Sequence, residues 1–283
     1  MRLIFSVIVT ITFFVSVARS QTNDPAAELH ALEQQLDTKL TAGKNTEADY
    51  ADLIKGFETF AAKEKTVDPT NAAEADFIKA RLYQIVLSDQ VKTGTLLRQL
   101  TNDFPQTPFG QQAGLLLQMI DQQVAEDKAM AEIIKKQGEL LAPGKPFPDF
   151  AEKDLDGKPL SVGAFKGKVV LVDFWATWCV LCRIDLPNVI AAYQKHHGEG
   201  FEIVGVSLDD DRSVLDRFLK NAEGMTWPQY FDGKHWENKL ARQYLVMSLP
   251  FNVLVGRDGK IIGTQLSGTA LDAAITAALG ANK

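Results

Sequence analysis

Cys179 and Cys182 are the only cysteines of the chain. Two residues separate them, and Cys179 directly follows Trp178. A structural disulfide usually closes a much longer loop, so this spacing suits a bond that is made and broken. Exchange needs a thiolate, and a free cysteine with a pKa near 8.5 is mostly protonated at neutral pH. A helix N-terminus favours the anion through its unpaired N–H groups and partial positive charge. If a helix starts at these residues, we expect Cys179 to be the attacking thiol. Cys182, one turn further into the helix, would then be the resolving thiol.

Alternating strands and helices surround the two cysteines. Residues 168–174 and 201–207 are continuous runs of β-forming residues, typical of strands covered on both faces. A helix predicted over 179–197 joins them into a βαβ unit with the cysteines at the helix start. The further elements predicted are helices over 211–221, 236–244 and 271–279, strands over 227–231, 251–255 and 261–265, and a hairpin turn at 257–260.

Residues 172–179, Val-Asp-Phe-Trp-Ala-Thr-Trp-Cys, together with Pro187, resemble the active-site segment of thioredoxins. The segments 156–158 and 165–168 are similar to the TlpA and ResA branch, whose members are exported thioredoxin-like reductases. The resemblance covers about residues 143–280. It implies a thioredoxin-like α/β fold with a central mixed sheet flanked by helices, and a thiol–disulfide oxidoreductase without a cofactor. Its partners would be protein disulfides or dithiols and an upstream electron donor or acceptor.

Two acidic residues gain roles from this resemblance. Asp173 is implied to be a buried acid beneath the cysteines that exchanges a proton with Cys182, and burial would raise its pKa toward neutrality. The alternative is a solvated aspartate at a strand end. Asp185 stands where related reductases often carry glutamate, and it is implied to tune the thiols. Its alternative is a solvent-facing acid in the first turns of a helix, where negative charge is favourable.

Leu249 and Pro250 precede a predicted strand, where the family has a cis-proline that faces the disulfide. Pro250 is therefore an implied site residue, and a trans-proline at a strand start is the alternative. The family commonly continues with threonine, whereas Phe251-Asn252 stands here, so we expect a less polar substrate groove. Val180-Leu181 replaces the proline-containing pair usual between the cysteines. The resemblance favours a reductase, but this departure leaves the reduction potential open.

Other classes of function fit the residues less well. A zinc site normally needs four ligands, and the chain has no second cysteine pair. The run Asp209-Asp210-Asp211 fits a helix cap better than a calcium site. A thiol peroxidase is the alternative enzyme, but Ala176 and Val172 stand where peroxiredoxins carry threonine or serine and proline. A third alternative is a partner-binding protein with a regulatory redox centre.

Residues 1–20 have the features of a signal peptide: Arg2, an apolar run over residues 3–17, and small residues before Gln21. We expect cleavage there and export, most plausibly to the bacterial periplasm or cell envelope. An uncleaved membrane tether is the alternative. Cleavage would remove two arginines and no acid, so the net charge would change from 30 − 36 = −6 to 28 − 36 = −8. So acidic a surface argues against nucleic acid as a partner.

Residues 21–141 have apolar residues at helical spacing and predict a separate helical domain. Thr107 and Pro108 read as the N-cap and first position of a long fifth helix. The domain is either a bundle that packs its own core or a set of helical hairpins that dock a protein. Residues 142–148 contain three prolines and a glycine, so they predict the linker, with a thioredoxin-like domain over 142–283.

Overall fold

The computed structural model describes residues 24–280, and the predicted signal peptide lies outside them. The chain divides into two compact units, of which the first ends at Glu126 and the second begins at Asp127. Helix α5 (Pro108–Leu140) contributes residues to both. Among the described residues, no helix combines the length and the apolar character needed to span a lipid bilayer.

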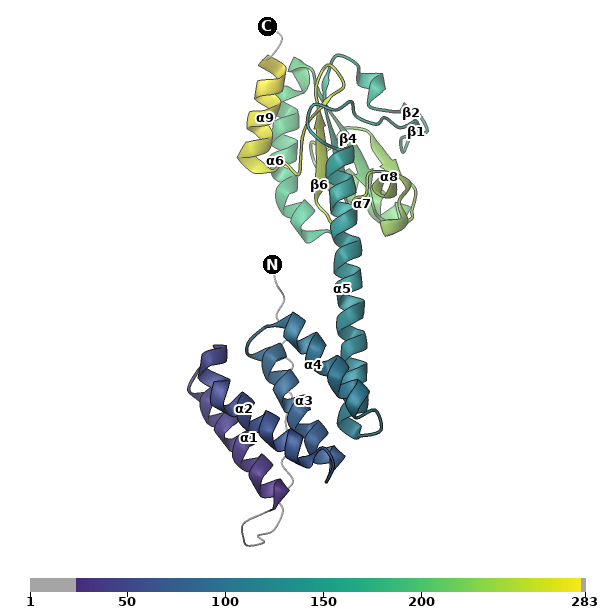
Figure 1. The fold of residues 1–283 in the computed structure, drawn as a ribbon. Coiled ribbons are helices and arrows are strands. Elements are labelled where there is room, and N and C mark those ends of the chain that lie inside the picture. The colour runs from purple at the N-terminus through teal and green to yellow at the C-terminus, as the bar shows by residue number, and fades with distance from the viewer. Residues whose placement is uncertain (1–23, 281–283) are drawn as a thin grey trace. The chain divides into compact units, whose positions relative to one another are not determined.

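The first unit is built from helices alone, as the sequence predicts (Figure 1). Its helices are α1 (Pro25–Thr41), α2 (Glu47–Glu64), α3 (Pro69–Ile85), α4 (Gln90–Asp103) and the first part of α5. Successive helices pack against each other and bury aromatic and aliphatic side chains between them. The predicted cap of α5 is confirmed, because the Gly110 amide donates a 3.0 Å hydrogen bond to Thr107 Oγ1.

A five-stranded mixed sheet forms the centre of the second unit. Its strand order is β5-β4-β3-β6-β7, with β3, β4 and β5 parallel and β6 and β7 antiparallel to their neighbours. The strands are β3 (Val169–Trp175), β4 (Phe201–Ser207), β5 (Gln229–Phe231), β6 (Phe251–Val255) and β7 (Ile261–Thr264). A separate two-stranded pair consists of β1 (Glu152–Lys153) and β2 (Pro159–Leu160).

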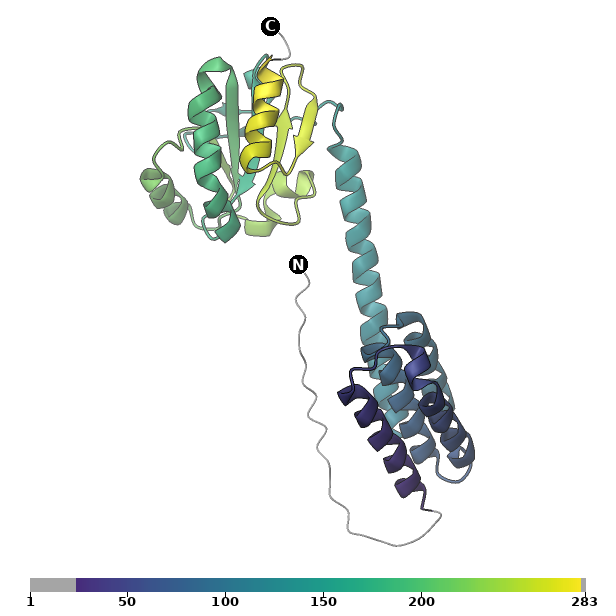
Figure 2. The same cartoon turned by 90° about the vertical axis from the view of Figure 1, so that its left-hand side faces the viewer.

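Helices flank this sheet, which confirms the predicted fold class. They are α6 (Val180–His196), α7 (Arg212–Asn221), α8 (Lys239–Gln243) and α9 (Gly268–Gly280). Helices α6 and α9 lie side by side over the sheet (Figure 1, Figure 2). Asp272 of α9 fastens them together, since its carboxylate accepts hydrogen bonds from the Lys195 ammonium and pairs with the His196 imidazole.

The predicted helix over 236–244 is divided in the structure. A 3-10 turn, η3 (His235–Glu237), comes first, and α8 starts anew after Asn238. The cause is local, because the Asn238 side-chain oxygen accepts hydrogen bonds from the amides of Leu240 and Ala241, both at 3.0 Å. An Asn with this geometry is an N-cap and begins a new helix.

The predicted linker pairs with the edge of the sheet. The Gly144 amide donates to the Ile261 carbonyl at 2.7 Å, and the Ile261 amide donates to the Lys145 carbonyl at 2.8 Å. The last turns of α5 also pack here, since the side-chain amide of Gln137 donates to the carbonyls of Tyr244 and Leu245. The boundary predicted between residues 141 and 142 therefore lies inside the second compact unit.

Candidate active site

Strand β3 sends its side chains alternately to the two faces of the sheet. Asp173 and Trp175 line a small pocket with Cys182 and Val189 of α6. Phe174, between them, contacts the rings of Tyr244 and Phe251 instead, with centroids 5.9 and 6.0 Å away. The pleat of β3 thus places Asp173 directly against the helix that carries the cysteines.

The loop between β3 and α6 is fastened to the end of β4. Thr177 donates hydrogen bonds from its amide and its hydroxyl to the Asp209 carboxylate, the latter at 2.6 Å. Ser207 Oγ donates to the same carboxylate at 2.7 Å. In the acidic run at 209–211, Asp211 caps α7 as predicted, with its carboxylate accepting from the Ser213 amide. Asp209 is a loop-fixing residue that the sequence did not indicate.

Cys179 is the N-cap residue of α6, which confirms the predicted position of the cysteines at a helix start. Its Sγ accepts a hydrogen bond from the Cys182 amide at 3.1 Å. The two cysteines form a disulfide with an S–S distance of 2.08 Å. Both side chains are equally buried, each 6% exposed, so exposure does not distinguish an attacking from a resolving thiol. The two cysteines differ in position: Cys179 caps the helix, and Cys182 lines the same small pocket as Asp173.

Asp173 is buried, which removes the alternative of a solvated strand-end acid. Burial, reinforced by the nearby charge of Asp185, raises the pKa of Asp173 to about 7. Its carboxyl group makes no hydrogen bond with any residue between 24 and 280. A carboxyl group of this kind is partly ionised at neutral pH, so it can both accept and return a proton.

Asp185 is half-buried in the second turn of α6 and lines the same small pocket as Asp173 and Cys182. Its carboxylate accepts a 2.9 Å hydrogen bond from the Asn188 side-chain amide. Pro187 follows inside the helix, where it has no N–H to donate to the carbonyl of Arg183. Asp185 is thus close enough to raise the pKa of Asp173. Its carboxylate is also bound by Asn188 on the same helix.

The peptide bond between Leu249 and Pro250 is cis, as the family resemblance implied. Pro250 lines the small pocket together with Cys182. Phe251 and Asn252 are both buried, and the side-chain amide of Asn252 donates to the Leu266 carbonyl at 2.8 Å. Neither side chain reaches the surface beside the disulfide, so the expected less polar substrate groove stays a prediction.

Trp178 is 41% exposed and stacks on the ring of His235, with centroids 4.7 Å apart and planes 20° apart. The ring centroids of Trp236 and Trp178 lie 5.8 Å apart. The sequence did not indicate His235 and Trp236, because they lie in η3, more than fifty residues from the cysteines, and have no characteristic spacing. Trp178 therefore belongs to an exposed aromatic cluster immediately before Cys179.

Comparisons with known proteins agree with this geometry in the C-terminal region. Residues 142–278 match the Redoxin family model. Thiol-disulfide oxidoreductase ResA from Bacillus thuringiensis subsp. konkukian is 33% identical over 119 residues, which cover 42% of this chain and 66% of ResA. ResA from Bacillus subtilis is 29% identical over 124 residues, covering 44% and 67%. The chain thus spans just under two thirds of the length of the first of these relatives.

Solved structures also match this region. The thioredoxin domain of a thiol-disulfide oxidoreductase from Bacteroides vulgatus is 32% identical, with a TM-score of 0.44, and the match covers 48% of this chain and 96% of that domain. A thiol:disulfide interchange protein from Bacteroides sp. is 31% identical, with a TM-score of 0.45, covering 50% and 94%.

The fold and the disulfide define the class of the C-terminal region: it is a thioredoxin-like domain with a Cys-x-x-Cys centre, similar to thiol–disulfide oxidoreductases. In the part of the chain that the structure describes, no three His, Cys, Asp or Glu side chains are grouped to hold a metal ion.

Proposed function

We propose that the protein is a thiol–disulfide oxidoreductase that reduces disulfides in exported proteins. One observation carries the proposal: the Cys179–Cys182 disulfide caps α6 directly beside a buried carboxyl group whose pKa lies near neutrality. A disulfide that only stabilised the fold would have no use for such an acid.

In the proposed reaction, the Cys179 thiolate of the reduced protein attacks one sulfur of a substrate disulfide. The substrate S–S bond breaks, its second sulfur leaves as a thiolate, and a mixed disulfide forms through Cys179. The Cys182 amide, which donates to Cys179 Sγ in the oxidised protein, stabilises the attacking thiolate together with the other N–H groups of the first turn of α6.

Resolution of the mixed disulfide uses the second cysteine and the buried acid. Ionised Asp173 accepts the proton of the Cys182 thiol, and the Cys182 thiolate attacks Cys179 Sγ. The bond to the substrate breaks and the substrate leaves as a dithiol, so two electrons pass to it and the Cys179–Cys182 disulfide remains. An upstream dithiol donor must then reduce this disulfide for another cycle.

We also propose that the protein works outside the cytoplasm, in the bacterial periplasm or cell envelope. The signal-like composition of residues 1–20 and the similarity of the C-terminal region to ResA support this location. Oxidising compartments of this kind contain the protein disulfides that such a reductase would act on.

Trapping experiments test the assignment of the two cysteines. Cys182→Ser should accumulate a mixed disulfide with a substrate protein through Cys179, detected by non-reducing electrophoresis and mass spectrometry of the linked peptides. Cys179→Ser should abolish reduction of insulin and trap nothing. The serine oxygen can still cap α6, so circular dichroism should show a folded protein. A mixed disulfide through Cys182 in the Cys179→Ser protein would contradict the assignment.

A further inference from the structure

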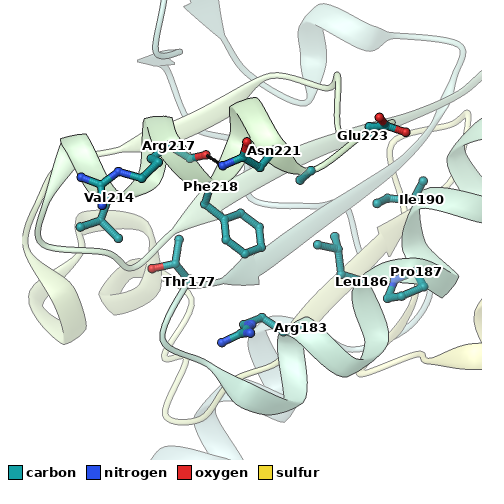
Figure 3. A pocket seen from close by; sticks show the side chains of 11 residues that line it. Thr177, Arg183, Leu186, Pro187, Ile190, Val214, Arg217, Phe218, Asn221 and Glu223 are labelled. Carbon is teal, nitrogen blue, oxygen red and sulfur yellow. Dashed lines mark hydrogen bonds between the residues drawn. The ribbon is translucent and has the colours of Figure 1, made fainter.

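A second, larger pocket lies between α6 and α7 (Figure 3). Its volume is about 550 Å³, within the range of ligand sites in proteins. Its apolar walls come from both helices: Leu186 and Ile190 of α6 face Val214 and Phe218 of α7. The pocket does not include Leu249 or Pro250, so it is separate from the cis-proline side of the disulfide.

One end of this pocket is positively charged and adjoins the redox centre. Arg183 directly follows Cys182 in the chain, and Arg217 lies on α7 with its side chain extending toward Val214, so that Thr177 lies between the two arginines (Figure 3). Neither guanidinium group forms an ion pair or a side-chain hydrogen bond with the residues from 24 to 280. Glu223, the only acid among the lining residues, lies beyond Phe218 toward the opposite end.

Two arginines beside an apolar wall fit a ligand with two parts, although Arg217 already interacts electrostatically with the Asp211 carboxylate and helps to lower its pKa. A guanidinium group matches a carboxylate with two parallel hydrogen bonds. The apolar wall gains stability only when it buries apolar surface. The Thr177 hydroxyl already donates to Asp209, which leaves the arginines as the polar groups of this end. A free inorganic anion would satisfy the arginines and leave the wall exposed.

We propose that this pocket is a substrate subsite that binds a peptide segment of the disulfide-bearing protein in which an acidic residue adjoins an apolar one. The carboxylate lies against Arg183 and Arg217, and the apolar side chain lies on Leu186 and Phe218. The subsite rests on the proposed function, since it would hold the substrate next to the attacking thiol. It gives the protein a preference for disulfides that have acidic and apolar residues beside them.

Binding can be tested without any redox step. Two fluorescent, cysteine-free peptides that differ only in Glu-Leu against Lys-Leu are titrated with the full-length oxidised protein, and fluorescence anisotropy gives both dissociation constants. We expect the Glu-Leu peptide to bind at least about fivefold more tightly, because exchanging the glutamate for lysine removes an attraction and adds a repulsion. The difference should shrink at high salt.

Two charge reversals on α7 separate the pocket from the general surface charge. Arg217→Glu should weaken Glu-Leu binding about fivefold or more and strengthen Lys-Leu binding. Lys220→Glu makes the same charge change on an exposed side chain of the same helix that does not line the pocket, and it should change binding less than about twofold. Val214→Ser, which alters the apolar wall, should weaken both peptides.

Several results would overturn the inference. They are equal binding of the two peptides, no binding of either below about 1 mM, or equal effects of Arg217→Glu and Lys220→Glu. Reduction of insulin by the same wild-type sample decides the proposed function separately. A protein that reduces insulin but binds the two peptides equally has the proposed activity and lacks this subsite. A protein that binds the Glu-Leu peptide more tightly but does not reduce insulin has the subsite and lacks the proposed activity.

Discussion

The helical unit starts its helices with side-chain oxygens, whereas one helix of the second unit starts with a sulfur. In the helical unit, α1, α2, α3 and α4 start with the side-chain oxygens of Asp24, Thr46, Asp68 and Asp89, each accepting a backbone N–H. In the second unit, α6 starts with the sulfur of Cys179. The same backbone donors that stabilise a helix when they meet oxygen favour a reactive thiolate when they meet sulfur. The start of α6 can thus serve chemistry, whereas the oxygen caps serve stability, including those of α7 and α8 in the second unit.

Two acids, one in each unit, differ in the same way. In the helical unit, Glu47 accepts hydrogen bonds from Lys92 and from the Tyr83 hydroxyl, and these bonds lower the pKa of Glu47. In the second unit, Asp173 is buried without such a partner, and its pKa is raised to about 7. Paired groups keep a fixed charge, whereas an unpaired buried acid changes its charge near neutral pH. Of these two acids, Asp173 is the one suited to exchange protons near neutral pH.

Asp173→Asn should have the largest effect of the substitutions that break this contrast. Without the buried acid, Cys182 loses its proton acceptor, so resolution of the mixed disulfide at pH 7 should slow roughly a hundredfold. Formation of the mixed disulfide should keep its rate, because Cys179 does not use this acid. Stopped-flow measurement of both steps checks the prediction, and equal slowing of the two would contradict it.

The same variant should alter the pH dependence of stability. The pKa of Asp173 is raised in the folded protein above its ordinary value of 3.8, so its contribution is fully present below about pH 4 and is lost as pH rises through about 7. The oxidised wild-type protein should thereby lose up to roughly 4 kcal/mol relative to Asp173→Asn between these limits. Urea unfolding of both proteins across this pH range measures the difference.

Thr46→Ala tests the other side of the comparison. The Thr46 hydroxyl accepts from the Asp49 amide, and the Asp49 carboxylate accepts from the Thr46 amide, which completes a capping box at the start of α2. Loss of the box should lower the free energy of unfolding of the helical unit by about 1 kcal/mol. Insulin reduction should be unchanged. A parallel loss of reductase activity would show that the two units are not separable in this way.

Asp185→Asn should have the smallest effect and would sharpen the account of Asp173. Asp185 raises the pKa of Asp173 less than burial does. Its neutralisation should lower that pKa by only part of the total shift, and the pH profile of mixed-disulfide resolution should move toward acid by the same amount. An unchanged profile would mean that Asp185 is the ordinary helix-surface acid of the alternative interpretation.

The sequence predicts the parts of the site that depend on local pattern. The two buried strands, the helix that starts at the cysteines and the Asp211 cap all follow from short-range periodicity and capping chemistry. The cis bond before Pro250 followed from the family resemblance. These features are encoded within a few residues of the chain, or by a recognisable motif.

The remaining features depend on contacts between distant segments. The stacking of His235 on Trp178 and the fastening of Thr177 by Asp209 join residues from separate loops, and no periodicity marks them. The predicted boundary at 142 was placed by its prolines, but the side chain of Gln137 before it binds the backbone of the second unit. Tertiary hydrogen bonds of this kind have no signature in the composition of a linker.

The equilibrium of the Cys179–Cys182 pair with glutathione tests the central claim most directly. The pair is titrated in buffers of defined ratio of reduced to oxidised glutathione, and the fraction of disulfide is read from alkylation and mass spectrometry. A protein that reduces exported disulfides should have a potential near −250 mV or lower. A value near −130 mV would place it among oxidants and would contradict the proposed direction of electron flow.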